Sequence, residues 1–137
     1  MSQTRRAVPQ VVVPLRRIDR PALAALSYAR SISEDVTALF AIHDSTEAES
    51  LRAQWRSRAD GVPIVVRTAH DGSLLSVLLP YLDERERQDP ERPVTVVVSD
   101  IVPRRPWSYL LNDTALALKL RLFFRPNTVV VDVPYHL

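Results

Sequence analysis

The sequence predicts an α/β domain with a parallel five-stranded sheet and helices on both faces. Short runs rich in β-branched residues alternate with stretches of helical periodicity, as in parallel strands joined by crossover helices. These runs are continuous in hydrophobicity, as expected of strands covered on both faces. The handedness of such crossovers favours the strand order 3-2-1-4-5. We expect the strands at residues 11–13, 36–42, 62–66, 94–98 and 128–133.

The first two helices have recognisable starts. Asp19 can cap a helix that has Pro21 in its first turn, and the pair Asp44 and Glu47 can open the next one. Both helices are expected to be amphipathic, with Trp55 on the apolar face of the second.

Proline marks the two later helices. A helix from Ser73 contains Pro80, which removes one helical hydrogen bond and should kink or restart it. The last helix begins near Pro106, because proline suits a first turn. Between them, residues 85–92 are charged and contain a proline, and we expect a solvated loop there.

Length and composition indicate one domain. The chain has 137 residues and is 46% hydrophobic, enough for a single core. We expect residues 1–9 to be a flexible amino-terminal segment and residues 10–137 to form the domain. A formal net charge of +2 does not call for a nucleic-acid partner. Cysteine is absent, and no apolar run approaches the roughly 20 residues of a membrane span.

Catalytic motifs are missing, so we do not expect an enzyme or a bound cofactor. The two glycines, Gly61 and Gly72, follow neither the first nor the fourth expected strand, which excludes glycine-rich phosphate loops. A serine triad would need one of three histidines, and no Gly-x-Ser-x-Gly elbow is present.

A metal site is a further alternative at two strand ends. His43 with Asp44 and His70 with Asp71 follow strands that we expect to be adjacent, and these side chains are metal ligands in other proteins. Both aspartates are also explained as residues that start helices. We therefore predict no metal site.

Four arginines are expected to surround one crevice. Ligands of open α/β sheets bind beyond the carboxyl ends of the strands, where the strand order reverses. If the first and fourth strands are neighbours, Arg16 and Arg17 face Arg104 and Arg105 there. Arginine forks match phosphate oxygens, a following helix start adds free N–H groups, and Trp107 could stack on a base.

A simpler interpretation remains open for each of these residues. The arginines can be solvated loop residues paired with Asp19, Asp100 or Asp113, and Trp107 can belong to the core.

The last strand predicts self-association. Residues 128–133 close the sheet with an almost wholly apolar edge, which invites pairing with another chain. A two-fold axis lets each copy cover the other, so we expect a homodimer through this strand.

The sequence resembles a known family over almost its whole length. It is similar to the cytosolic carboxyl-terminal domain of bacterial permeases of the amino acid-polyamine-organocation superfamily, including KimA-type potassium importers. The segments that carry the resemblance are Val11-Val-Val-Pro-Leu15, residues 20–33, Val62-Pro-Ile-Val65, Val102-Pro-Arg-Arg105, Trp107, Leu110-Leu-Asn112 and Val133-Pro-Tyr-His-Leu137.

The resemblance implies a fold, a setting and a ligand. Such domains are similar in fold to universal stress proteins, dimerise, and in potassium importers are implicated in inhibition by cyclic di-AMP. The chain would then be a cytoplasmic domain that residues 1–9 link to the transmembrane part of the same permease. Cyclic di-AMP, or another adenine nucleotide, would be held by the arginines, with Trp107, Tyr135 or His136 stacking on it.

Two alternatives to this regulatory function stay open. The domain can be a purely structural dimerisation module of the transporter without a small-molecule ligand. It can also be an ATP- or AMP-binding protein of the universal-stress type, although the glycines that hold ATP in those proteins are missing here.

Overall fold

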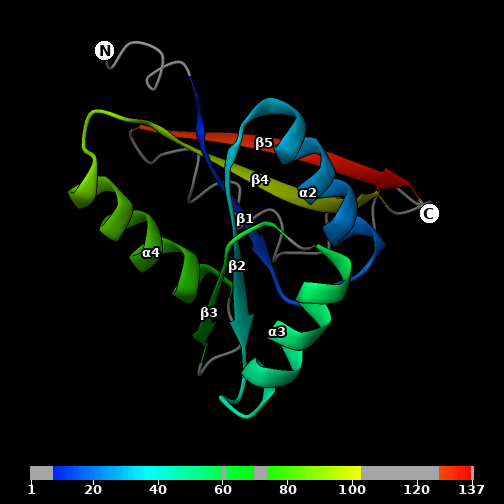
Figure 1. Ribbon diagram of the computed structural model, residues 1–137. Coiled ribbons are helices and arrows are strands. Elements are labelled where there is room, and N and C mark those ends of the chain that lie inside the picture. The colour runs from blue at the N-terminus through cyan, green and yellow to red at the C-terminus, as the bar shows by residue number, and fades with distance from the viewer. Residues whose placement is uncertain (1–7, 60, 70–73, 103–126, 137) are drawn as a thin grey trace.

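The computed structural model describes residues 8–59, 61–69, 74–102 and 127–136, with the backbone alone at 100–102, 135 and 136. Within these ranges the chain forms a sheet flanked by helices (Figure 1). The elements in chain order are β1 (Gln10–Leu15), α2 (Arg20–Ile32), β2 (Asp35–Ile42), α3 (Glu47–Arg58), β3 (Ile64–Thr68), α4 (Leu74–Gln88), β4 (Val94–Val102) and β5 (Thr128–His136).

The sheet has the predicted topology. Its five strands lie in the order β3-β2-β1-β4-β5, and every neighbouring pair is parallel. The order 3-2-1-4-5 is therefore confirmed. The predicted strand ends were less accurate, because β3 ends at Thr68, β4 continues to Val102 and β5 continues to His136. Residues 99–102, which follow the strand expected at residues 94–98, thus belong to β4.

The helices cover both faces of the sheet, as predicted. One core cluster joins α2 and α3 to the side chains of Val11, Val13 and Phe40, and the other joins α4 to Val12 and Leu39. Successive residues of β1 thus enter opposite cores, since side chains alternate along a strand. This explains why the strand is apolar without interruption.

The first two helices begin where the sequence indicates. The Asp19 carboxylate accepts a hydrogen bond from the N–H of Ala22 at 2.9 Å, and Pro21 lies in the first turn. Asp44 instead accepts from the N–H of Thr46 at 3.1 Å, in a turn that precedes the helix start at Glu47. Both aspartates direct chain reversals after strands, which supports their structural interpretation.

Helix α4 does not restart at Pro80, contrary to one of the two outcomes expected there. It runs as one helix from Leu74 to Gln88. Pro80 is exposed, whereas Val77, Leu78, Tyr81 and Leu82 are buried. The lost hydrogen bond therefore lies on the solvent side, and burial of the opposite face holds the helix together.

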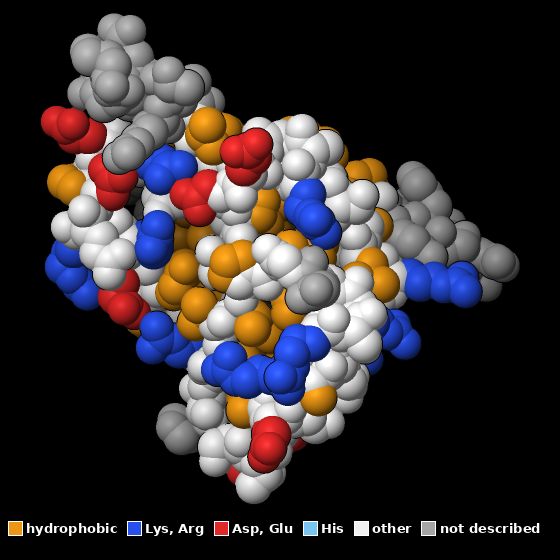
Figure 2. All heavy atoms as spheres, viewed as in Figure 1, with side chains coloured by type: hydrophobic (Ala, Val, Ile, Leu, Met, Phe, Trp, Pro, Cys, Tyr) orange, Lys and Arg blue, Asp and Glu red, His pale blue; other side chains and the backbone are white. Residues whose placement is uncertain are grey.

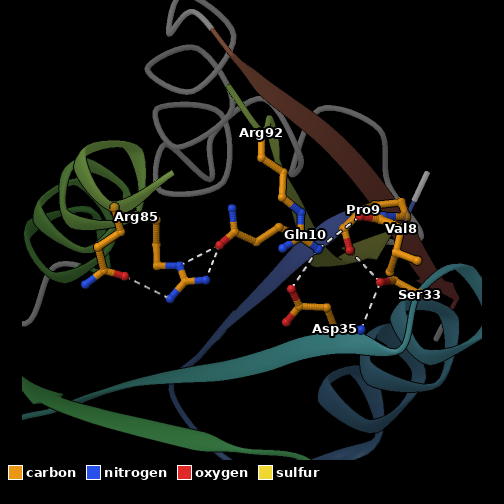
Figure 3. A network of polar contacts seen from close by, with 8 residues as sticks. Val8, Pro9, Gln10, Ser33, Asp35, Arg85 and Arg92 are labelled. Atoms are coloured by element: carbon orange, nitrogen blue, oxygen red, sulfur yellow. Dashed lines mark hydrogen bonds and ion pairs between the residues drawn. The ribbon is translucent and has the colours of Figure 1, made fainter. Parts of the chain in front are cut away.

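The expectation of a solvated loop over residues 85–92 was wrong for its first half, because α4 continues to Gln88 and only residues 89–93 form the connection to β4. Arg85 to Gln88 form the last turn of α4, and the Arg85 Nε donates to Oε1 of Gln10 at 2.6 Å (Figure 3). Arg92 reaches Asp35 and Val8 in the same region. Charge-assisted hydrogen bonds to partners more than 50 residues away tie this stretch to the amino ends of β1 and β2.

None of the helices in the described ranges has both the length and the hydrophobicity of a membrane span.

Candidate ligand crevice

The crevice begins where β1 and β4 separate. The two strands pair only from Gln10 with Val94 to Val12 with Val96. On its other side, β1 stays paired with β2 as far as Leu15. Pro14 follows the last β1–β4 pair by two residues, and its ring nitrogen has no hydrogen to donate to a ladder. The carboxyl ends of these central strands therefore diverge at the point where the strand order reverses, as the sequence predicts.

A cavity of about 180 Å³ lies at this divergence. Its walls come from the end of β1, the start of α2, the start of α4 and the middle of β4. The lining residues are Pro14, Leu15, Arg16, Arg17, Asp19, Ala22, Leu74, Val98 and Ser99. The cavity is smaller than the roughly 300–1,000 Å³ typical of sites for drug-sized ligands, so the described residues can enclose only part of a nucleotide.

Arg16 and Arg17 give this cavity its basic character. Both side chains are exposed, and neither forms an ion pair with any carboxylate among the described residues. Asp19 lines the same cavity but uses its carboxylate to cap α2. Two guanidinium groups face one carboxylate, so the crevice is suited to an anion.

The structure describes the other predicted binding residues only in part or not at all. Arg104, Arg105 and Trp107 lie outside the described residues, as does Asp113. Tyr135 and His136 are the last two residues of β5, and their backbone pairs with Ile101 and Val102 of β4. The structure thus brings together Arg16 and Arg17 but leaves the opposite wall of the predicted arginine cluster undescribed.

Two residues that line the crevice, the polar Ser99 and the apolar Leu74, were not predicted from the sequence. Ser99 lies beyond the strand expected at residues 94–98, yet it belongs to β4 and lines the cavity. The sequence could have indicated this position, because Ser99 is the first polar residue after the run Val94 to Val98. Leu74 comes from the start of α4, and no local pattern indicates that this helix begins beside β1 and β4.

The alternative metal site receives no support from the described residues, which contain no group of three metal-ligating side chains. His43 and Asp44 are exposed after β2, while His70 and Asp71 lie outside the described residues.

Comparison with known proteins identifies the family of the chain. The family model of the KimA potassium transporter C-terminal domain matches residues 5–135. The chain belongs to this family. The resemblance to the carboxyl-terminal domains of potassium-importing permeases is thereby confirmed. The family takes its name from a transporter rather than from an enzyme.

A curated relative agrees with this assignment. The chain is 25% identical over 129 residues to "Potassium transporter KimA" of Bacillus subtilis (strain 168). The match covers 92% of this chain but 21% of the relative. The KimA-type domain therefore corresponds to about a fifth of the length of that transporter.

Proposed function

We propose that this KimA-type domain regulates a potassium transporter by binding cyclic di-AMP at the crevice between β1 and β4. The observation that carries the proposal is the pair Arg16 and Arg17, which lines a cavity at the switch point without an ion-pair partner among the described residues. Each guanidinium can donate two parallel hydrogen bonds to the oxygens of one phosphate. Arg104 and Arg105 complete the proposed site from the β4 side, and Trp107, Tyr135 or His136 stack on the bases.

A homodimer is the second part of the proposal. β5 is an edge strand of the described sheet, and Val129 on it is 50% exposed. An exposed apolar edge favours pairing with a second copy. Cyclic di-AMP is itself two-fold symmetric, so each half can contact the same residues from each subunit across a two-fold axis. This symmetry, and the incomplete enclosure by one copy, favour cyclic di-AMP over ATP or AMP.

The proposed setting is the cytoplasmic side of a membrane. Residues 1–9 would link the domain, residues 10–137, to the transmembrane part of the same permease. Val8 and Pro9, at the end of this segment, are held by Arg92 and Ser33 through their carbonyl oxygens. A ligand that favours one arrangement of the dimer could thus act on the transporter, since only differential affinity shifts a conformational equilibrium.

Calorimetric titration of the 137-residue chain with cyclic di-AMP, ATP and AMP tests the proposal. We expect heat from cyclic di-AMP that saturates at one ligand per dimer, and weaker binding of the two mononucleotides. Tighter binding of ATP would contradict the proposal and would favour an ATP-binding protein of the universal-stress type.

A purely structural dimerisation module is the second candidate, and the exposed Val129 on the edge strand favours it. It predicts a dimer in solution and no heat with any of the three nucleotides. The same titration, combined with light scattering, therefore separates the two functions.

A further inference from the structure

We propose that a second basic pocket, formed by α3 and the start of β3, binds the phosphate of an anionic phospholipid headgroup. This pocket lies apart from the crevice described above and shares no lining residue with it. Its volume is about 340 Å³. It is lined by Arg52, Trp55, Arg56, Gly61, Val62, Pro63 and Ile64.

Arg52 and Arg56 form the polar side of the pocket. They are four residues apart on α3, so they lie one above the other on the same face of the helix. Both are exposed, and no carboxylate among the described residues pairs with either. Two unpaired guanidinium forks one helical turn apart can hold the oxygens of one phosphate between them.

The rest of the pocket is apolar. Trp55 is buried, and its Nε1–H already donates to the carbonyl oxygen of Val62 at 2.9 Å. The indole N–H is thus already used, and among the described lining residues only the side chains of Arg52 and Arg56 carry a charge that attracts an anion. Figure 2 shows arginine side chains gathered beside hydrophobic ones on this face of the molecule. Such a pairing suits a ligand with a charged head and an apolar body.

Charges of opposite sign lie at the two ends of α3. Glu47 and Glu49 stand in its first turn, whereas Arg56 and Arg58 stand in its last turn. An anionic surface would therefore attract the carboxyl-terminal end of the helix and repel its start. The family of this domain is that of a transporter carboxyl-terminal domain, so a bilayer is the anionic surface that best explains the arrangement.

Vesicle sedimentation tests the proposal with the 137-residue chain. The chain should sediment with vesicles of phosphatidylcholine mixed with phosphatidylglycerol and stay in solution with vesicles of phosphatidylcholine alone. The double substitution Arg52→Gln, Arg56→Gln should weaken this binding about tenfold or more, since each basic residue near an anionic surface contributes about 1 kcal/mol.

The matched control is Arg20→Gln, Arg30→Gln, which removes the same charge from exposed positions on α2. It should retain vesicle binding. If both double variants lose binding equally, net charge alone attracts the chain and the proposed pocket is wrong. Displacement from vesicles by dissolved glycerol 3-phosphate, at concentrations far below those of the salt, would show that a free phosphate compound is the ligand instead.

This inference can fail independently of the proposed function. The Arg52→Gln, Arg56→Gln variant should bind cyclic di-AMP as the parent does, because neither arginine lines the crevice. Circular dichroism of the variant should match that of the parent, since both side chains are exposed. Loss of vesicle binding with an intact fold supports the pocket, and unchanged vesicle binding overturns it.

Discussion

Arg92 and Asp35 form an ion pair with a nitrogen–oxygen distance of 2.8 Å, and the same Arg92 nitrogen donates to the carbonyl oxygen of Val8 at 3.0 Å (Figure 3). One guanidinium thus joins the loop before β4, the start of β2 and the residue that leads toward β1. The Arg92 side chain is 24% exposed, so solvent screens this pair only in part. These contacts hold Val8 against the amino end of the sheet.

Replacing Arg92 with alanine should lower the free energy of unfolding by about 1–3 kcal/mol, because it removes hydrogen bonds to a charged group and to a backbone carbonyl. Urea denaturation followed by circular dichroism measures the change. The control is Arg67→Ala, which breaks a longer pair with Glu84 (3.6 Å, side chains 49% and 42% exposed). That variant should lose less than about 1 kcal/mol. Equal losses would show that Arg92 is an ordinary surface charge.

Trp55 should be the costliest side chain of α3 to remove. It is 3% exposed, its ring packs edge-on against Phe40 with centroids 5.3 Å apart, and its Nε1–H binds Val62. Trp55→Phe keeps the ring contact and leaves the Val62 carbonyl without its donor, at about 1–2 kcal/mol. Trp55→Ala adds a cavity, for a total of about 3–5 kcal/mol. Urea titrations that give the same loss for both variants would contradict the separate role of the hydrogen bond.

The sequence predicted the sheet well, because burial on both faces leaves a local pattern in each strand. Strand order followed from crossover handedness, which is also a general rule. The errors fell where distant contacts decide the structure. Gln10 is polar and was left out of the first strand. It is nevertheless only 2% exposed, and its side-chain oxygen accepts a hydrogen bond from Arg85, 75 positions away. A local charge pattern cannot reveal such a partner.

Part of the candidate crevice follows from the same general rules. Arg16 and Arg17 follow a central strand, and the topological rule alone places them at the crevice. Leu74 lines the cavity because α4 begins there, on the return of the chain from β3 to the sheet. No spacing of residues in the sequence predicts where this helix begins relative to the strands. Arg104, Arg105 and Trp107 remain predictions, since they lie outside the described residues.

Loss of the crevice arginines should weaken nucleotide binding without unfolding the domain. Arg16→Ala, Arg17→Ala removes two exposed side chains, and each phosphate–arginine pair is worth about 1.5–3 kcal/mol, so affinity for cyclic di-AMP should fall about tenfold or more. Arg104→Ala, Arg105→Ala should do the same if those residues form the opposite wall. Calorimetry with cyclic di-AMP measures both. A folded variant that binds as tightly as the parent places the site elsewhere.

A charge on the β5 edge should disrupt the proposed dimer. Val129→Lys would place a charge on the apolar edge that the second copy is proposed to cover, and burying or crowding that charge should weaken association about tenfold or more. Light scattering at micromolar concentration reports the change as a shift toward the monomer. Thr68→Lys is the control, because Thr68 is exposed on β3, at the opposite edge of the sheet. A parent chain that is already monomeric would refute the β5 interface directly.

Substitutions of Asp19 should distinguish its effect on the stability of α2 from its effect on the charge of the crevice. Its carboxylate caps the helix by accepting from the N–H of Ala22, and it also stands beside Arg16 and Arg17 in the cavity. Asparagine caps a helix about as well as aspartate, so Asp19→Asn should change the free energy of unfolding by less than about 0.5 kcal/mol. Asp19→Ala should lose about 1 kcal/mol.

Both Asp19 variants remove a negative charge from a site proposed to bind an anion. Cyclic di-AMP should therefore bind more tightly to Asp19→Asn than to the parent, by about threefold to tenfold, because repulsion from the carboxylate is gone while the helix start is kept. The gain should shrink as salt is added, since exposed charges are screened. Calorimetric titrations at two salt concentrations measure both effects. Weaker binding by Asp19→Asn would mean that the carboxylate contacts the ligand itself, and the crevice would then not be the general anion site proposed here.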